Sequence, residues 1–591
     1  MIKAFLLLLI SSLLPQLSFA RNISENHPSP YVRLHANDAV KWQLWDGSVL
    51  QRAQKENKLI FISSGYYACH WCHVMRKETF DDEQVARVLN ENFISVKLDR
   101  ELNSVVDAYL MEFLEKTQGR GGWPLNVVLT PDGYPLTGMV YLPKYNFLKV
   151  MRKLNNRWLK QSDELNAIAR NIFQHTQRES LQLKNISANN LLKKLMVSVE
   201  ESADDFEGGF GNRAKFPRPY LLMSLLKVYE DTRDADLKEF LVLTLNQMVE
   251  QGLYDAVGSG FFRYTIDQSW KVPHFEKMLY TNAAMIKLYV QAYKIFADQK
   301  WLQVAEQTQD FIMRDMKYEK GGYVGSLSAQ DKNEIEGGNY IWQKEELMGL
   351  LNARQQSWFE KNVQFTQVPE SEAVMPLGFW QGDEAEEIKP LLLNRRQQNK
   401  PLKDNKFNIS WNAYLLISMV ELAAVSDKPR YKQAANEQFN LLKNLADSRL
   451  VRNSQIHGQR YLEDYVFLAY AMWSWSDQLS KAADDSRVDS LLNEALQRFL
   501  GGAGWRESDG AIIPLPGESL VSKDGNLPSA AVYMSKLVKA RWAEKARIRV
   551  KLRDKLRDVA LKVDVSTVEN PLESSSYIIE LCEQSETGCK N

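Results

Sequence analysis

Two cysteines separated by two residues are the side chains best suited to chemistry in this sequence. They lie in the run Cys69-His70-Trp71-Cys72-His73, and the 591 residues contain four cysteines in all. Two thiols at this spacing suit reversible disulfide exchange, metal binding or covalent attachment of haem. The elements around the cysteines must therefore distinguish these three uses.

The pair lies where a strand is expected to turn into a helix. Residues 58–63 are short, apolar and β-branched, which predicts a strand, and apolar residues recur at roughly helical spacing over 74–90. A helix N-terminus offers unpaired N–H groups and a partial positive charge, and both stabilise a thiolate more than a thiol. We therefore expect a pKa of Cys69 below that of a free thiol, with protonated His70 and His73 adding to the effect.

A proline downstream favours disulfide exchange. Pro124 leads from Gly121-Gly122-Trp123 directly into the apolar run 125–129, and a Pro-Asp-Gly turn follows. Together with a dithiol on a strand-to-helix turn, this pattern predicts a cis peptide bond before Pro124, whereas a lone proline would suit an ordinary trans turn. Cys72, one turn further into the helix, is expected to be the more buried, resolving thiol.

The N-terminus resembles a signal peptide. Lys3 precedes the apolar run 4–14, and Ser18-Phe19-Ala20 has the small-x-small ending of a signal-peptidase site. The run is shorter than the about 20 residues that a membrane span needs. We expect a signal peptide at 1–20, and a periplasmic or secreted protein that is not bound to the membrane once the signal is cleaved. Such compartments are oxidising and keep disulfides.

The other two cysteines, Cys582 and Cys589, lie close together near the C-terminus. We expect them to form a structural disulfide, and the short loop that it closes constrains the unfolded chain by about 2 to 3 kcal/mol. A more specific alternative is that this pair serves Cys69 as an internal substrate or electron relay.

Charge and length limit the remaining possibilities. Lys plus Arg and Asp plus Glu both number 74, so the chain has no electrostatic footprint for nucleic acid. The basic run 539–557 contains acidic and apolar residues at helical spacing, as a solvated helix face does. Alternating β-like and helical runs predict an α/β domain over 21–165, and long amphipathic stretches predict a helical domain over 185–546, followed by a C-terminal tail at 547–591.

Motifs along most of the chain resemble one known family, in the same order. They are Ser29-Pro30-Tyr31, Gly65-Tyr66, the dithiol run, Leu98-Asp99-Arg100-Glu101, Gly122-Trp123-Pro124-Leu125-Asn126, Trp270-Lys271-Val272-Pro273-His274-Phe275-Glu276-Lys277-Met278-Leu279-Tyr280, Ser410-Trp411-Asn412 and Leu462-Glu463-Asp464-Tyr465. The family is the thioredoxin-like one that includes spermatogenesis-associated protein 20. The resemblance implies a thioredoxin-like α/β domain followed by an all-α (α/α)6 toroid, similar to six-hairpin glycosidases and N-acylglucosamine 2-epimerases. It transfers only the dithiol role, onto Cys69 and Cys72, with Pro124 as the matching proline.

The sequence departs from this family at places that bear on its chemistry. Lys41 stands where the family usually has Asp, and Thr281 replaces the Asp that commonly follows Leu-Tyr. Ser63 stands near the place where thioredoxin relatives often bury an Asp beneath the dithiol. Proton transfer is then expected to involve His70, His73 or water.

Two other interpretations of the cysteine motif remain. Cys-x-x-Cys-His is also the attachment site of c-type haem, with His73 as the axial ligand, but the strand-to-helix setting and the downstream Trp-Pro strand favour a redox dithiol. Structural zinc held by the two cysteines and two histidines is disfavoured, because adjacent residues at a helix start do not easily converge on one tetrahedron. We expect neither a metal nor a cofactor.

The helical domain offers candidates for a second site. They are Arg263, Trp270, His274, Glu276, Lys277, Tyr280, Glu463 and Asp464. Histidine or carboxylates can act as general acid and base on a sugar, and aromatic faces stack on pyranose rings, although a large helical core also needs aromatic residues. The sequence therefore predicts an exported thiol–disulfide oxidoreductase that acts on protein thiols or disulfides with a redox partner. A carbohydrate-acting or carbohydrate-binding toroid is the competing function.

Overall fold

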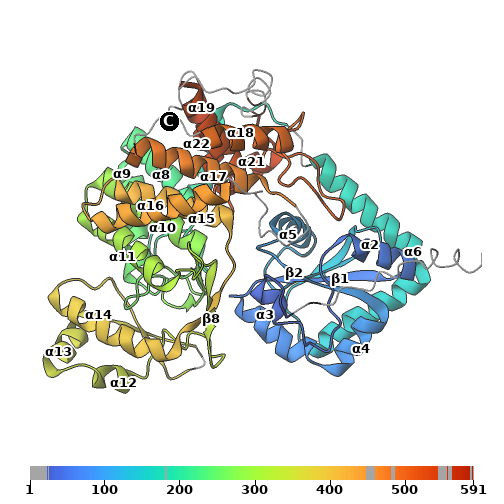
Figure 1. The fold of residues 1–591 in the computed structure, drawn as a ribbon, viewed down its shortest axis with the longest axis horizontal. Helices are drawn as coiled ribbons and strands as arrows, with labels where there is room; N and C mark the ends of the chain where they lie inside the picture. Colours follow the sequence, from blue (N-terminus) through green and yellow to red (C-terminus); the bar gives the residue numbers. More distant parts are fainter. Residues whose placement is uncertain are drawn as a thin grey trace, which may run out of the picture.

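The computed structural model describes residues 23, 25–179, 183–369, 371–446, 459–480, 486–543, 556, 559, 562–585 and 589. The expected signal peptide, 1–20, lies outside these residues, as does most of the basic run 539–557. Within the described residues the chain forms an α/β domain and a helical domain, which lie side by side in Figure 1.

The α/β domain is built on a four-stranded sheet with the order β2-β1-β3-β4. Its strands are β1 (Leu59–Gly65), β2 (Phe93–Asp99), β3 (Leu125–Leu129) and β4 (Pro135–Met139). β1 pairs with β2 in parallel, and β3 is antiparallel to both β1 and β4. This topology is thioredoxin-like, and the strand predicted over 58–63 and the apolar run 125–129 are confirmed as β1 and β3.

Helices cover both faces of this sheet, which explains why every residue of β1 and β2 is buried. Alternate residues of β1 belong to two separate cores: Phe61 packs with α4 (Glu83–Asn92) and α6 (Lys144–Glu179), and Ile60 and Ile62 pack with α2 (Gly47–Glu56) and α5 (Ser104–Gln118). The side chains alternate because successive residues of a strand point to opposite faces.

The single helix expected over 74–90 is divided. It comprises α3 (His70–Met75), a π-helical turn at Arg76–Phe80, and α4. Asp82 starts α4 anew, because its carboxylate accepts hydrogen bonds from the amides of Gln84 and Val85.

The helical domain is an all-α (α/α)6 toroid. Six helices form a closed inner ring in which each packs on the next and the last packs on the first: α8 (Pro219–Thr232), α10 (Leu279–Phe296), α15 (Ile409–Ala423), α17 (Leu462–Trp475), α19 (Ala530–Ala543) and α22 (Ser575–Gln584). Outer helices in the described residues alternate with them along the chain: α7 (Ala188–Ser202), α9 (Ala235–Glu250), α11 (Gln299–Asp315), α16 (Pro429–Ala446) and α18 (Ser486–Phe499). α15 is buried on nearly all sides, as an inner helix must be.

The ring extends beyond the boundary expected from the sequence. α22 lies in the stretch 547–591, which the sequence analysis assigns to a tail, and it contacts both α19 and α8. Cys582 belongs to α22 and forms a disulfide with Cys589. The disulfide therefore anchors the end of the chain to an inner helix.

A segment inserted between α11 and α15 carries short strands and helices. It contains β8 (Ser326–Asp331), α12 (Lys344–Gly349), α13 (Ala353–Asn362), β9 (Phe365–Gln367), β10 (Val374–Pro376), α14 (Asp383–Arg396) and β11 (Pro401–Asp404). β8 pairs with β11 and with β7 (Lys277–Met278), and it contacts α3 of the thioredoxin-like domain. In Figure 1, α12 to α14 lie at the far side of the segment and β8 lies toward the thioredoxin-like domain.

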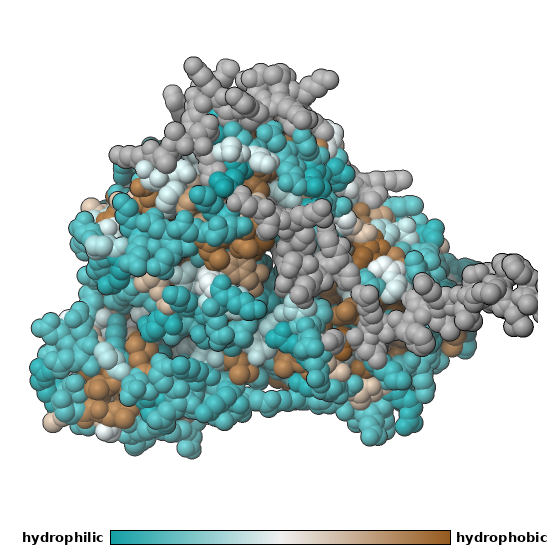
Figure 2. Space-filling model, viewed as in Figure 1, coloured by the Kyte–Doolittle hydropathy of each residue, from teal (hydrophilic) through white to brown (hydrophobic). Residues whose placement is uncertain are grey.

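Among the described residues, no helix combines the length and the apolar character needed to cross a membrane. The visible face of the molecule is largely hydrophilic, with hydrophobic residues in small separate patches (Figure 2).

Candidate functional site

The dithiol lies at the N-terminus of a helix, as the sequence predicts. Cys69 is the N-cap of α3, and its sulfur accepts a hydrogen bond of 3.1 Å from the backbone amide of Cys72. The two cysteines form a disulfide with Cα atoms 5.3 Å apart, and both are almost fully buried. On reduction, the same amide and the helix N-terminus favour negative charge on the Cys69 sulfur.

A glycine lets β1 end close beneath the dithiol. A Cβ atom on Gly65 would lie 2.7 Å from the Cys72 sulfur and closer still to the Tyr31 hydroxyl oxygen. A larger residue would therefore displace the resolving cysteine. The Tyr31 hydroxyl is buried, with no hydrogen-bond partner among the described residues. Neither residue stands out in the sequence for this role.

The peptide bond between Trp123 and Pro124 is cis, as predicted. The Trp123 side chain donates a hydrogen bond of 3.1 Å to the Asp107 carboxylate, and the Arg100 guanidinium lies 3.8 Å from the centre of a Trp123 ring. Tyr66 meets the same side chain edge-on, with ring centres 5.9 Å apart. Trp123 is therefore held between the dithiol loop and α5.

A lysine occupies the interior of the thioredoxin-like domain near Ser63. Lys97 is the residue of β2 that pairs with Ser63 of β1, and its ammonium group donates a hydrogen bond of 3.1 Å to the Ser63 hydroxyl. The rings of Tyr31, Trp42 and Phe80 surround the ammonium at 4.6 to 5.3 Å. Burial lowers the pKa of Lys97 to about 7. A charged residue inside the apolar run 93–98 is the sequence signal for this group, and the sequence analysis missed it.

Burial changes the expected role of the two histidines. The pKa of His70 falls to about 4 through burial and the neighbouring His274, and burial also lowers the pKa of His73. Both imidazoles are therefore neutral near pH 7, rather than the positive charges that the sequence analysis expects. The His73 Nε2 lies 2.8 Å from the Tyr67 carbonyl oxygen, so this ring holds the loop before the dithiol.

His70 faces the helical domain. Its Nε2 lies 3.3 Å from one carboxylate oxygen of Glu336, and the other oxygen of Glu336 lies 3.7 Å from Nε2 of His274. The two imidazole rings are 6.2 Å apart. Glu336, in the loop after β8, therefore contacts a histidine from each domain.

Three of the candidates expected in a sugar pocket lie against the dithiol domain instead. The Tyr66 hydroxyl donates hydrogen bonds of 2.8 and 3.0 Å to the Glu276 carboxylate. The Arg263 guanidinium contacts the same hydroxyl and lies 3.3 Å from Glu276. Nδ1 of His274 lies 3.4 Å from Glu276. We name Tyr66, His70, Arg263, His274, Glu276 and Glu336 the interdomain cluster.

The remaining candidates are dispersed. Trp270 is fully buried and donates to the Glu207 carbonyl, and Lys277 forms a buried ion pair of 2.7 Å with Asp255. Burial lowers the pKa of Lys277 to about 8. Tyr280 packs edge-on against Trp411, and Asp464 is buried in the first turn of α17. Of the eight, Glu463 lines a cavity.

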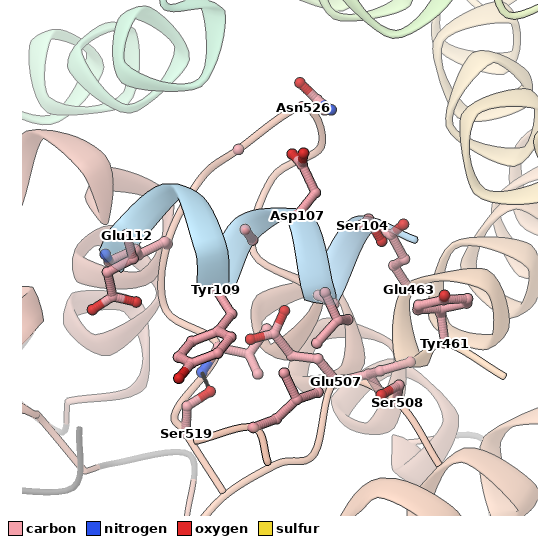
Figure 3. Close-up of a pocket in the computed structure, with 18 of the residues that line it drawn as sticks. Ser104, Asp107, Tyr109, Glu112, Tyr461, Glu463, Glu507, Ser508, Ser519 and Asn526 are labelled. Carbon is pink, nitrogen blue, oxygen red and sulfur yellow. Dashed lines mark hydrogen bonds between the residues drawn. The ribbon is translucent and has the colours of Figure 1, made fainter. Parts of the chain in front are cut away.

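This cavity lies between α5 and the toroid and has a volume of about 1010 Å3. Figure 3 shows α5 with Ser104, Asp107, Tyr109 and Glu112 on one side, and Tyr461, Glu463, Glu507 and Ser508 of the toroid on the other. Trp123 also lines the cavity, so this residue lies between the dithiol site and the cavity.

A buried charge cluster joins the domains beside the cavity. The Lys406 ammonium, just after β11, lies 2.7 Å from Asp99, 2.8 Å from Glu101 and 2.6 Å from Asp404. All four side chains are almost fully buried, and burial raises the pKa of Glu101 to about 8. In the described part of the chain, no group of three or more His, Cys, Asp or Glu side chains is arranged to hold a metal ion.

Comparison with known proteins shows which family and which relatives this chain resembles. Residues 21–177 match the family Thioredox_DsbH, described as a protein of unknown function, DUF255. An uncharacterized protein of Caenorhabditis elegans is 28% identical over 86% of this chain and 78% of its own length. Spermatogenesis-associated protein 20 of Mus musculus is 35% identical over 55% of this chain, but the match spans only 44% of the mouse protein.

Among solved structures, cellobiose 2-epimerase of Spirochaeta thermophila aligns with 66% of this chain and 84% of its own, at 13% identity and a TM-score of 0.41. The resemblance of the motifs to the family of spermatogenesis-associated protein 20 is thus confirmed by the sequence matches. Residues 21–177, which form the thioredoxin-like domain, are thus similar to the Thioredox_DsbH (DUF255) family.

Proposed function

We propose that this protein is a thiol–disulfide oxidoreductase that acts on protein disulfides in the periplasm or outside the cell. The observation that supports the proposal is the position of Cys69 at the N-terminus of α3. Its sulfur accepts a hydrogen bond from the Cys72 amide and is bonded to the Cys72 sulfur. This geometry stabilises the thiolate that exchange requires.

Exchange with a client disulfide proceeds in two balanced steps. The Cys69 thiolate attacks one sulfur of the client, a mixed disulfide forms, and the second client sulfur leaves as a thiolate that takes up a proton. The Cys72 thiolate then attacks Cys69 in the mixed disulfide and releases the first client sulfur. The client gains two electrons, the Cys69–Cys72 disulfide results, and a dithiol redox partner must reduce it again. The reverse sequence oxidises a client.

The interdomain cluster supplies the groups that handle protons in this scheme. His70 follows Cys69 directly and is neutral near pH 7, so it can accept a proton as the Cys69 thiol ionises and return it to a leaving thiolate. Glu336 stabilises the imidazolium that forms, because its carboxylate lies 3.3 Å from His70. The toroid thereby contributes Glu336 to the dithiol site.

Reduction of insulin and refolding of scrambled ribonuclease test the proposal in the full chain. Cys69→Ser is expected to lose at least about 100-fold in rate, because it lacks the nucleophile. Cys72→Ser is expected to accumulate mixed disulfides, because it lacks the resolving thiol. The double variant Cys582→Ser with Cys589→Ser is the matched control, and it is expected to keep the activity.

Inertness of the wild-type chain in both assays, with either reduced or oxidised Cys69 and Cys72, would refute the redox function. A control variant as inactive as Cys69→Ser would instead assign the chemistry to the C-terminal pair. Export is tested separately by sequencing the N-terminus of the mature protein, which is expected to begin at Arg21.

A further inference from the structure

The cavity between α5 and the toroid has an unusual balance of charge. Among the described residues that line it, ten are acidic and three are basic. The acidic residues are Glu101, Asp107, Glu112, Glu115, Glu463, Glu507, Asp509, Glu518, Asp524 and Asp564, and the basic residues are Arg100, Arg506 and Lys523. The chain as a whole has equal numbers of acidic and basic residues, so the excess is local.

Several of these carboxylates have structural partners. Asp509 lies 3.3 Å from both Arg460 and Arg498, and Glu518 accepts hydrogen bonds from the amides of Ala503 and Gly504. Asp564 caps the helix Val565–Glu569 by accepting from the Thr567 amide. Glu463, in the first turn of α17, is favoured there by the helix N-terminus. These residues explain part of the negative charge without a ligand.

Glu507 has no such explanation. Its carboxylate lines the cavity and forms no hydrogen bond or ion pair with any described residue. Figure 3 shows it below α5, on the same side of the helix as Tyr109. Burial and then the neighbouring Glu463 raise the pKa of Glu507 to about 7, and the charge of Lys523 offsets this rise only in part.

A hydrogen-bond donor that lines the cavity, the side-chain amide of Asn408, also lacks a partner among the described residues. Asn408 lines the cavity with 4% of its surface exposed, and no described residue accepts a hydrogen bond from its side-chain Nδ2. Its orientation is fixed, because Oδ1 accepts from the Trp411 amide as the N-cap of α15. The free N–H groups therefore require an acceptor from a ligand or from water.

Aromatic side chains complete the walls. Trp123, Tyr109, Trp411 and Tyr461 all line the cavity, from both domains. Aromatic rings beside carboxylates suit an organic cation, which gains from the ring faces as well as from the charge. The volume, about 1010 Å3, is at the upper end of the roughly 300–1,000 Å3 of small-molecule sites, so it leaves room for several amino-acid residues.

We propose that the cavity binds a basic segment of a polypeptide, with a lysine or arginine side chain at Glu507 and a backbone carbonyl oxygen at Asn408 Nδ2. A peptide carries both groups that the cavity lacks, a cation and a hydrogen-bond acceptor. A neutral sugar would satisfy Asn408 but leave the negative charge uncompensated. The proposal does not depend on the redox function, because no residue of the dithiol takes part in it.

Isothermal titration with the full chain tests the proposal. The probe is a capped pentapeptide, acetyl-Gly-Lys-Gly-Lys-Gly-amide, and its matched control carries norleucine in place of both lysines. The lysine peptide is expected to bind at least about tenfold more tightly, which corresponds to about 1.4 kcal/mol. Free spermidine and a neutral cello-oligosaccharide are titrated alongside it, to separate a peptide from a small amine or a sugar.

Substitutions of residues that line the cavity test whether the lysine peptide binds there. Glu507→Gln is expected to weaken the lysine peptide about tenfold, and Asn408→Ser, which keeps an oxygen for the helix cap, about fivefold. Glu239→Gln, on the exposed surface of α9, is the matched control and is expected to change nothing. Equal binding of both peptides, unchanged binding by Glu507→Gln, or tighter binding of spermidine or the oligosaccharide would each overturn the proposal.

The dithiol assays distinguish this proposal from the redox function. Glu507→Gln is expected to reduce small disulfides at the wild-type rate while it binds the lysine peptide more weakly. Conversely, Cys69→Ser is expected to bind the peptide normally.

Discussion

Two regions of the interface between the domains differ in whether their charged side chains have partners: the surroundings of the dithiol and the cavity. Around the dithiol, each charged group of the interdomain cluster meets a partner from the other domain, as Arg263 and Glu276 do with Tyr66. In the cavity, carboxylates outnumber cations and Glu507 has no partner. Matched groups hold the domains together, whereas unmatched groups are available to a ligand.

The largest expected effect on stability comes from the buried charge cluster around Lys406, in which charges of both domains are paired. Lys406→Met leaves Asp99, Glu101 and Asp404 without their shared cation, so we expect the free energy of unfolding to fall by about 3–5 kcal/mol. Urea unfolding measures this loss. Lys400→Met, on an exposed nearby residue, is the control and is expected to change stability by less than about 0.5 kcal/mol.

A second substitution sharpens this test. Adding Glu101→Gln to Lys406→Met removes one of the orphaned carboxylates and is expected to recover part of the lost stability. If Lys406→Met were as stable as the Lys400 control, the cluster would not be what joins the domains.

The next largest effect concerns the lysine inside the thioredoxin-like domain, and it depends on pH. Below about pH 7, Lys97 is protonated in both the folded and the unfolded chain, so its full burial cost destabilises the fold. Between about pH 7 and pH 10.5, the ordinary pKa of lysine, Lys97 loses its proton in the folded chain and keeps it in the unfolded chain. The free energy of unfolding therefore rises with pH in this range. Above 10.5 both are neutral.

Lys97→Met removes this dependence. The free energy of unfolding of the variant, relative to wild type, is expected to be highest below about pH 7. This difference is expected to fall by about 2.7 kcal/mol over the two pH units between about pH 7.5 and pH 9.5. Urea unfolding at several pH values measures the difference. Lys55→Met, on an exposed residue, should show no such slope, and a flat difference for Lys97→Met would mean that Lys97 stays protonated in the fold.

The thioredoxin-like core was predictable because its signals are local. β1, β2 and β3 are short β-branched runs, Cys69 follows one of them, and Pro124 introduces another, so adjacent residues specify the dithiol and its cis-proline. The toroid was predictable from motif order and from long amphipathic stretches. The start of α4 at Asp82 was missed because the apolar spacing continues through the break.

The partners of the dithiol were not predictable in the same way. Glu336 lies in a loop with no regular pattern, and Lys406 is 307 residues away from Asp99 in the chain. His274 and Glu276 were recognised as chemically capable, but their assignment to a sugar pocket assumed that they line the toroid. Which domain a side chain meets is decided by the packing of the two domains, and single-chain periodicity carries no information about it.

A smaller effect is expected where the two histidines meet. Glu336→Gln removes the carboxylate beside His70, so the pKa of His70 falls further and proton transfer slows; we expect exchange to be about tenfold slower. The pH profile of the exchange rate is the readout, because a merely structural change would lower the rate at all pH values alike. Glu334→Gln, two residues away and exposed, is the control.

The smallest effect tests whether exposure, rather than position at the interface, decides what an ion pair contributes. Lys77 and Glu334 pair across the same interface as Lys406 and its carboxylates, but their side chains are 48% and 58% exposed. Water and salt screen such a pair, so Lys77→Met is expected to cost less than about 1 kcal/mol, and less still at high salt. Urea unfolding at low and high salt measures it against Lys406→Met. A cost for Lys77→Met as large as that for Lys406→Met would show that bridging the two domains, and not burial, gives these contacts their strength.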